Sequence, residues 1–138
     1  MGRKDRKADP ECTEEDAQLA REAEKLGYKI RSVYDFVNNT PDPFLPRTFI
    51  GSYERAYPML VRHLTLPHHP RVREGIIRAL TVKDGGQLVS DALLDQFTIE
   101  KDSILRWVLA NALRTAMPLK QRKRHPEIAG VLNGKTVL

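Results

Sequence analysis

The chain has 138 residues, of which 41% are hydrophobic and 30% charged, and this composition indicates a folded protein rather than a disordered one. No apolar run approaches the roughly 20 residues of a membrane-spanning helix, so we expect no membrane association. The net charge of +5 is compatible with nucleic acid or an acidic protein as partner, although basic tails are more often only solvated. Cys12 is the single cysteine, which excludes an intrachain disulfide and favours a reducing cytoplasm.

The basic residues are concentrated near the two ends of the chain. Four of the first seven residues are Arg or Lys, and no apolar stretch follows them, so the sequence predicts no secretory leader. We therefore interpret residues 1–12 as a flexible basic segment. Residues 119–138 form a second basic segment with room for a short helix, and residues 11–25 between them are acidic.

In chain order, the first predicted helix runs from Thr13, a good N-cap, to Leu26, where Gly27 ends it. Ser32 is placed to cap a short second helix over 33–38. Three prolines then fall within residues 41–46, and each disfavours the helical conformation in the residue before it. This stretch is the best candidate for a boundary inside the chain.

The rest of the chain contains an internal repeat. Residues 52–81 align with residues 85–114 at an offset of 33, which is typical of stacked helix pairs. The alignment places ten apolar residues opposite apolar residues: Ala56/Val89, Leu60/Leu93, Val61/Leu94, Leu64/Phe97, Leu66/Ile99, Val72/Leu105, Ile76/Leu109, Ile77/Ala110, Ala79/Ala112 and Leu80/Leu113.

Each unit of this repeat predicts two helices joined by a polar turn. Apolar spacings of three and four indicate first helices over 57–66 and 88–98. The second helices are expected over 70–80 and 103–115, with Asp102 as the N-cap of the later one.

An apolar first helix with an early proline, a short polar turn, and a second helix that opens Val72-Arg73 or Leu105-Arg106 and ends Ala-Leu is similar to the HEAT repeat. The resemblance implies an all-α, right-handed stack of about three antiparallel helix pairs. It places units 13–39, 52–81 and 86–115 in one domain over 13–118. HEAT repeats usually pair the repeat arginine with an acidic residue in the inter-helix turn. Glu100 is placed for this in the second unit, but the first unit has Pro67 there.

No catalytic signature is present in the sequence, so we expect no enzyme, no cofactor and no small-molecule substrate. Gly85-Gly86 lacks the Gly-Lys-Ser/Thr that grips a nucleotide phosphate. His63, His68 and His69 form the one cluster to weigh as metal ligands. No cysteine or carboxylate completes a ligand set within a few residues, and turn polarity with N-capping by His69 explains them without a metal.

The second helices of solenoid repeats usually line the binding surface. Trp107 aligns with Glu74 of the first unit, so it occupies a position where the sister unit exposes a charge. It is either a binding hot spot or a cover for the core, and its alignment favours exposure. The candidate partner-binding residues are Arg71, Glu74, Arg78, Trp107, Asn111 and Arg114.

Three further residues on these helices indicate structural roles. The repeat position of Arg73 and Arg106 favours hydrogen bonding to a neighbouring turn over contact with a ligand. Gly75 lies in mid-helix, where glycine is less favourable than alanine by about 1 kcal/mol, so the sequence predicts a close approach of another helix.

These observations predict a cytoplasmic binding protein whose partner is another protein. The small stand-alone bacterial HEAT-like proteins that the chain resembles include some that look like immunity proteins, which implies a toxin as one form of that partner. The first alternative is nucleic-acid binding, which Arg71, Arg78 and Arg114 favour and Glu74 opposes. The second is a damage-processing enzyme on the same scaffold, for which the single Trp lacks an adjacent acidic residue.

Overall fold

The computed structural model describes residues 10–38 and 52–134. Over these residues the secondary structure is helical with no strand, which confirms the all-α class. Its helices are α2 Pro10–Lys25, α3 Tyr34–Val37, the 3-10 helix η1 Glu54–Ala56, α4 Tyr57–Leu64, α5 Pro70–Ala79, α6 Gly86–Ile99, α7 Ser103–Ala116, α8 Leu119–Arg122 and α9 Pro126–Leu132. None of these helices is long and apolar enough to cross a bilayer. The predicted boundary at 41–46 and the basic residues at 3–7 lie outside the described ranges.

Two side-chain N-caps and one glycine at a helix C-terminus lie where the sequence predicts them. The Nδ1 atom of His69 accepts a hydrogen bond from the backbone N–H of Arg71 at 3.1 Å, and this caps α5. Asp102 Oδ1 accepts from the N–H groups of the second and third residues of α7, at 2.9 and 3.0 Å. Gly27 has a φ of +97°, which glycine adopts without strain, and it follows the end of α2.

The predicted start of the first helix at Thr13 is wrong. The helix α2 begins three residues earlier, at Pro10. Proline is well suited to the first helical position because its fixed φ is helical and the N–H that it lacks would have no partner there.

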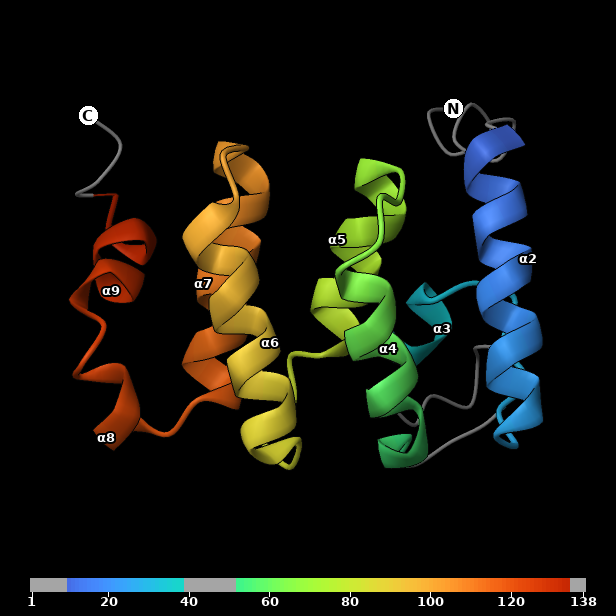
Figure 1. Ribbon diagram of the computed structural model, residues 1–138, viewed down its shortest axis with the longest axis horizontal. Helices are drawn as coiled ribbons and strands as arrows, with labels where there is room; N and C mark the ends of the chain where they lie inside the picture. The colour runs from blue at the N-terminus through green and yellow to red at the C-terminus, as the bar shows by residue number, and fades with distance from the viewer. Residues whose placement is uncertain (1–9, 39–51, 135–138) are drawn as a thin grey trace.

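The two repeat units form antiparallel helix pairs that lie side by side. In Figure 1, α4 packs beside α6 and α5 beside α7, and the equivalent helices of the two pairs run in the same direction. The hydroxyl of Tyr57 at the start of α4 donates to Asp84 Oδ1, which lies just before α6, at 2.7 Å. This bond joins corresponding ends of the two pairs.

The helix α2 runs in the opposite direction to α4 (Figure 1). Glu15, early in α2, accepts from the backbone N–H of His69 beyond the end of α4. Glu22, two turns further along the same face of α2, contacts His63 inside α4. Later residues of α2 therefore contact earlier residues of the α4 segment, so α2 and α4 are antiparallel, whereas α4 and α6 are parallel.

Burial follows the 33-residue repeat. Eight of the ten aligned apolar pairs are buried in both units, and Val61/Leu94 is partly buried in both. The pair Leu66/Ile99, at the ends of the first helices, is exposed in both. Equivalent positions thus have equivalent environments, as the sequence alignment requires.

The helices α3 and α9 pack against the second-helix layer, α3 on α5 and α9 on α7. A Cβ atom on Gly75 would lie 2.5 Å from Val33 Cγ1 and 2.9 Å from Tyr34 Cε2. The predicted close approach at Gly75 is therefore confirmed, and its partner is α3. At the other end, Ile128 of α9 is 2% exposed and belongs to the core.

Candidate partner-binding site

The predicted residues on α5 already make contacts within the chain. The guanidinium of Arg71 lies over the ring of Tyr34, 5.5 Å from its centroid, and the Tyr34 hydroxyl donates to the carbonyl of Arg71 at 2.7 Å. Arg78 donates from Nε to Glu74 at 2.8 Å. The α5 half of the candidate site is thus partly occupied by α3 and partly charge-compensated.

The predicted residues on α7 form a more open stripe. Trp107 is 43% exposed, so part of its side chain is accessible to a partner. Asn111 lies one turn after Trp107 and Arg114 lies two turns after it, and Arg114 Nη2 donates to Asn111 Oδ1 at 2.9 Å. Ile104, one turn before Trp107, is 67% exposed and extends the stripe. Spacings of three and four place all of these residues on one side of α7.

Ile104 was missed at the sequence level although a signal for it existed. The offset of 33 places Ile104 opposite Arg71, a charged residue. This is the same mismatch that singles out Trp107 opposite Glu74. An exposed isoleucine next to an exposed tryptophan adds apolar area to the candidate surface.

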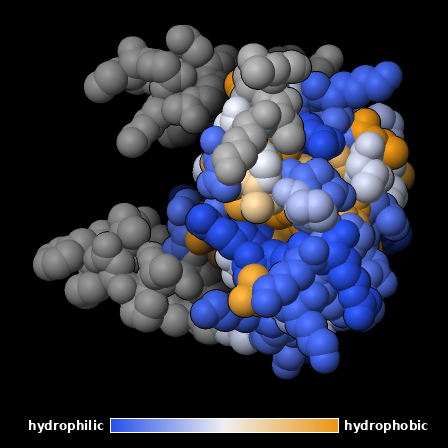
Figure 2. Space-filling model, turned by 90° about the vertical axis from the view of Figure 1, so that its left-hand side faces the viewer, coloured by the Kyte–Doolittle hydropathy of each residue, from blue (hydrophilic) through white to orange (hydrophobic). Residues whose placement is uncertain are grey.

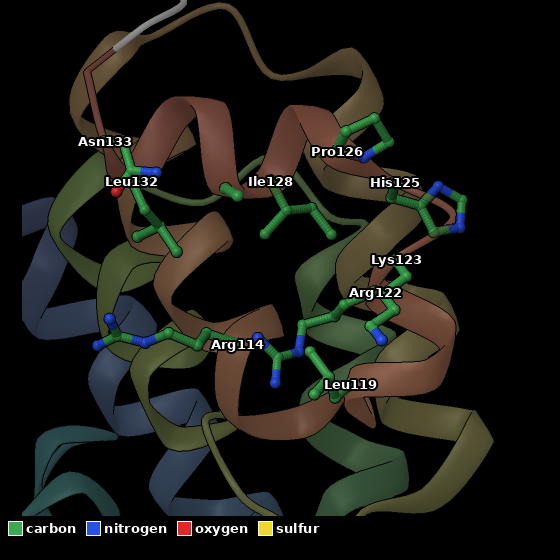
Figure 3. Close-up of a pocket in the computed structure, with 10 residues that line it drawn as sticks. Arg114, Leu119, Arg122, Lys123, His125, Pro126, Ile128, Leu132 and Asn133 are labelled. Carbon is green, nitrogen blue, oxygen red and sulfur yellow. The ribbon is translucent and has the colours of Figure 1, made fainter.

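A pocket of about 340 Å³ lies beside the end of this stripe, between α7, α8 and α9. Figure 3 shows Ile128 extending from α9 toward Arg122, with Leu119 beyond it, and Leu132 lying above Arg114. Figure 2 faces this end of the molecule and shows hydrophobic residues between hydrophilic ones. The sequence prediction treated 119–138 as a basic segment, so it contained no hint of a pocket. The cause is that the pocket forms only when α9 folds back onto α7.

No protein-family model matches this chain, and no curated protein or solved structure matches it either.

The histidine cluster joins α2 to the first repeat unit. Glu15 Oε1 lies 2.5 Å from His68 Nδ1, His68 Nε2 lies 2.9 Å from His63 Nδ1, and His63 Nε2 lies 3.0 Å from Glu22 Oε2. The four side chains form one hydrogen-bonded chain, and both rings are almost fully buried. In the described residues, no group of three or more His, Cys, Asp or Glu is arranged to hold a metal ion.

Arg62 adds a cation to one end of this hydrogen-bonded chain, with Nη2 2.5 Å from Glu22 Oε1.

The environment of Glu22 reflects these partners. Burial by itself would raise the pKa of Glu22, but the hydrogen bonds from His63 and Arg62 and their positive charge outweigh it and lower the pKa below its usual value. The sequence prediction of a turn role for the histidines missed both glutamates, because Glu22 lies 41 residues before His63 and Glu15 lies 53 residues before His68.

Arg73 and Arg106 have the structural role that their repeat position predicts, since each donates to a backbone carbonyl of its own unit. Glu100 pairs with Arg73, from Nη2 to Oε1 at 2.9 Å. The acidic residue in the turn of the second unit therefore binds the arginine of the first unit.

Proposed function

We propose that the protein is a non-enzymatic, HEAT-like binding protein that recognises another protein through its second-helix layer. The observation that carries the proposal is the half-exposed Trp107, which lies on α7 between the more exposed Ile104 and the Asn111–Arg114 pair. Aromatic and arginine side chains at the centre of a rigid surface are the residues that most often dominate protein–protein affinity.

The repeat arrangement supports a HEAT-like stack. The two units, which repeat at an offset of 33 residues, have matching burial, run parallel to each other and are joined by the Arg73–Glu100 pair. In this proposal the stack is right-handed, and α2–α3 and α8–α9 extend it at the two ends. The second helices α5 and α7 then provide the recognition surface, which fits Arg71, Glu74, Arg78, Trp107, Asn111 and Arg114.

An immunity-type role, in which the protein occludes a toxin in the cytoplasm, is one concrete form of this function. The resemblance to small bacterial HEAT-like proteins supports it. A toxin-like reading frame beside the gene would support the immunity role, and neighbouring genes unrelated to toxins would argue against it.

Nucleic-acid binding is the alternative, because Arg114, Arg122 and Lys123 bring three cations to one pocket. The exposed Ile104 and Trp107 favour protein instead, since backbone recognition of a duplex uses cations rather than apolar side chains.

The experiment that tests the proposal is affinity capture from cytosol of the native host, followed by calorimetry with the purified captured protein. The double substitution Trp107→Ala with Arg78→Ala should lower affinity at least tenfold while leaving the helical circular dichroism and Tm nearly unchanged. Leu88→Ala is the matched control, because Leu88 is 50% exposed on the first helix α6. Equal loss in the control variant contradicts the proposal. So does salt-dependent retention on duplex DNA with no protein captured.

A further inference from the structure

We infer that the pocket between α7, α8 and α9 anchors an acidic–apolar peptide segment of the partner, with the partner's carboxylate against Arg122 and its neighbouring apolar side chain against Leu119, Ile128 and Leu132. This inference rests on the proposed function and adds the chemistry of the segment that is recognised.

Arg122 is the group that would hold the carboxylate. Its Nε atom donates to the carbonyl of Met117 at 2.9 Å, which fixes the side chain at the junction of α7 and α8. Figure 3 shows its guanidinium directed toward the space below Ile128. A guanidinium that is held at Nε still offers its terminal amino groups, and two such N–H donors match the two oxygens of a carboxylate.

The remaining cations of the pocket surround this group. Arg114 and Lys123 line the pocket on either side, and His125 lies at its edge. No Asp or Glu is among the ten residues that line it. The carboxylate of Glu127 lies 3.6 Å from His125 Nδ1, so it compensates the edge rather than the centre. The charge of the pocket therefore selects an anion.

The apolar lining selects what the anion is attached to. Leu119 is 59% exposed, and it lines the pocket together with Ile128 and Leu132. Inorganic phosphate or a duplex backbone would leave this leucine in water. A volume of about 340 Å³ is at the lower end of the range for small-ligand pockets and accommodates an aliphatic side chain next to a carboxylate.

The pocket continues the α7 stripe, and this continuity favours a peptide over a free carboxylic acid. Arg114 belongs to both, and it lies seven residues after Trp107 on the same face of α7. Seven residues of helix span about 10 Å, which an extended peptide covers in about three residues. A segment that places an apolar residue on Trp107 should therefore reach Arg114, on the lining of the pocket, with the side chain about three positions away.

A synthetic peptide tests this arrangement directly. The probe is the capped peptide Ser-Leu-Ser-Ser-Glu-Leu-Ser, and its partner probe has Gln in place of Glu. Calorimetry measures affinity, and Trp107 emission reports contact with the stripe because Trp107 is the single tryptophan. We expect saturable binding with a shift in Trp107 emission, and at least tenfold weaker binding of the Gln peptide.

Variants of the protein locate the binding. Arg122→Gln and Leu119→Ala should each weaken binding of the Glu peptide, the former at least tenfold. Leu119 is exposed, so its truncation leaves the core intact even if Arg122→Gln disturbs the α7–α8 junction. Arg124→Gln is the matched control, because Arg124 is exposed, adjacent and absent from the pocket lining, and it should change affinity less than twofold.

Three results overturn the inference. They are equal binding of the Gln peptide, equal losses in Arg124→Gln and Arg122→Gln, and binding of octanoate in the pocket without binding of the peptide. If Arg122→Gln and Leu119→Ala leave capture of the partner protein unchanged while the Trp107/Arg78 double variant abolishes it, the pocket inference fails and the proposed function stands. If the double variant also retains the partner, the proposed function fails as well.

Discussion

Arg73 and Arg106 make the same hydrogen bond in consecutive repeat units. Arg73 Nη1 donates to the carbonyl of Leu64 at 2.7 Å, and Arg106 Nη1 donates to the carbonyl of Phe97 at 2.6 Å. Donors and acceptors are both 33 residues apart. Each bond satisfies a carbonyl near the end of a first helix, where intrahelical partners run out. The two units therefore share a side-chain hydrogen bond as well as an apolar pattern.

Arg73→Ala should destabilise the protein more than Arg106→Ala. Arg73 also donates to Gln96 Oε1 and Glu100 Oε1, so its removal leaves a largely buried carboxylate without its cation. We expect a loss of about 3 kcal/mol in the free energy of unfolding for Arg73→Ala and about 1.5 kcal/mol for Arg106→Ala. Urea denaturation measures both. Equal losses would show that the link to Glu100 contributes nothing.

Gly75→Ala should destabilise the protein although alanine is the better helix former. The new methyl group would overlap Val33 Cγ1, and overpacking of this kind typically costs about 1–3 kcal/mol. Thermal denaturation should show a lower Tm for Gly75→Ala. The double variant with Val33→Ala should recover part of the loss, because Val33 supplies the nearest atom. A stabilising Gly75→Ala would argue against the close approach of α3.

His68→Gln should loosen α2 from the rest of the molecule. The substitution interrupts the hydrogen-bonded chain between Glu15 and His63 at its centre. Loss of two buried hydrogen bonds corresponds to about 2 kcal/mol. Amide hydrogen exchange should accelerate first in α2, before α6 and α7. His125→Gln is the control, since His125 lies in the loop before α9, far along the chain from α2, and it should leave exchange in α2 unchanged.

Glu22 gives a pH dependence with a defined sign. Because its pKa is lower in the folded protein than in the unfolded chain, its contribution to stability is fully present above the unfolded value of about 4.3. That contribution is lost as the pH falls through the lowered folded value. Glu22→Gln should therefore flatten the fall in unfolding free energy below about pH 5. Glu24→Gln, an exposed neighbour on α2, should leave the slope as it is in the parent protein. Identical slopes for the parent and Glu22→Gln would contradict this account.

Local signals in the sequence were sufficient for the repeat and for most helix ends. The offset of 33 predicted which apolar positions share an environment, and the capping roles of His69 and Asp102 were readable from neighbouring residues. The exposure of Trp107 followed from its alignment with Glu74. These features depend on residues that are close in the sequence or related by the repeat.

Contacts outside the repeat had no such signal. The partnership of Glu15 and Glu22 with the two histidines depends on how α2 docks, and the direction of α2 differs from that of α4. The pocket around Arg122 depends on the return of α9 to α7. The sequence predicted a capped helix at 13–26 and a basic segment at 119–138, and neither prediction says which charged groups meet.

The two ends of the described part of the molecule differ in the side chains that they expose. A run of identical units leaves an unsatisfied apolar layer at each end. At the α2 end, Glu14, Gln18 and Arg21 are exposed, so the layer terminates in a hydrated, charged surface. At the α9 end, Leu119 and Leu132 line an open pocket. The two ends of the described residues therefore differ in chemistry, with charged and polar side chains at α2 and leucines beside cations at α9.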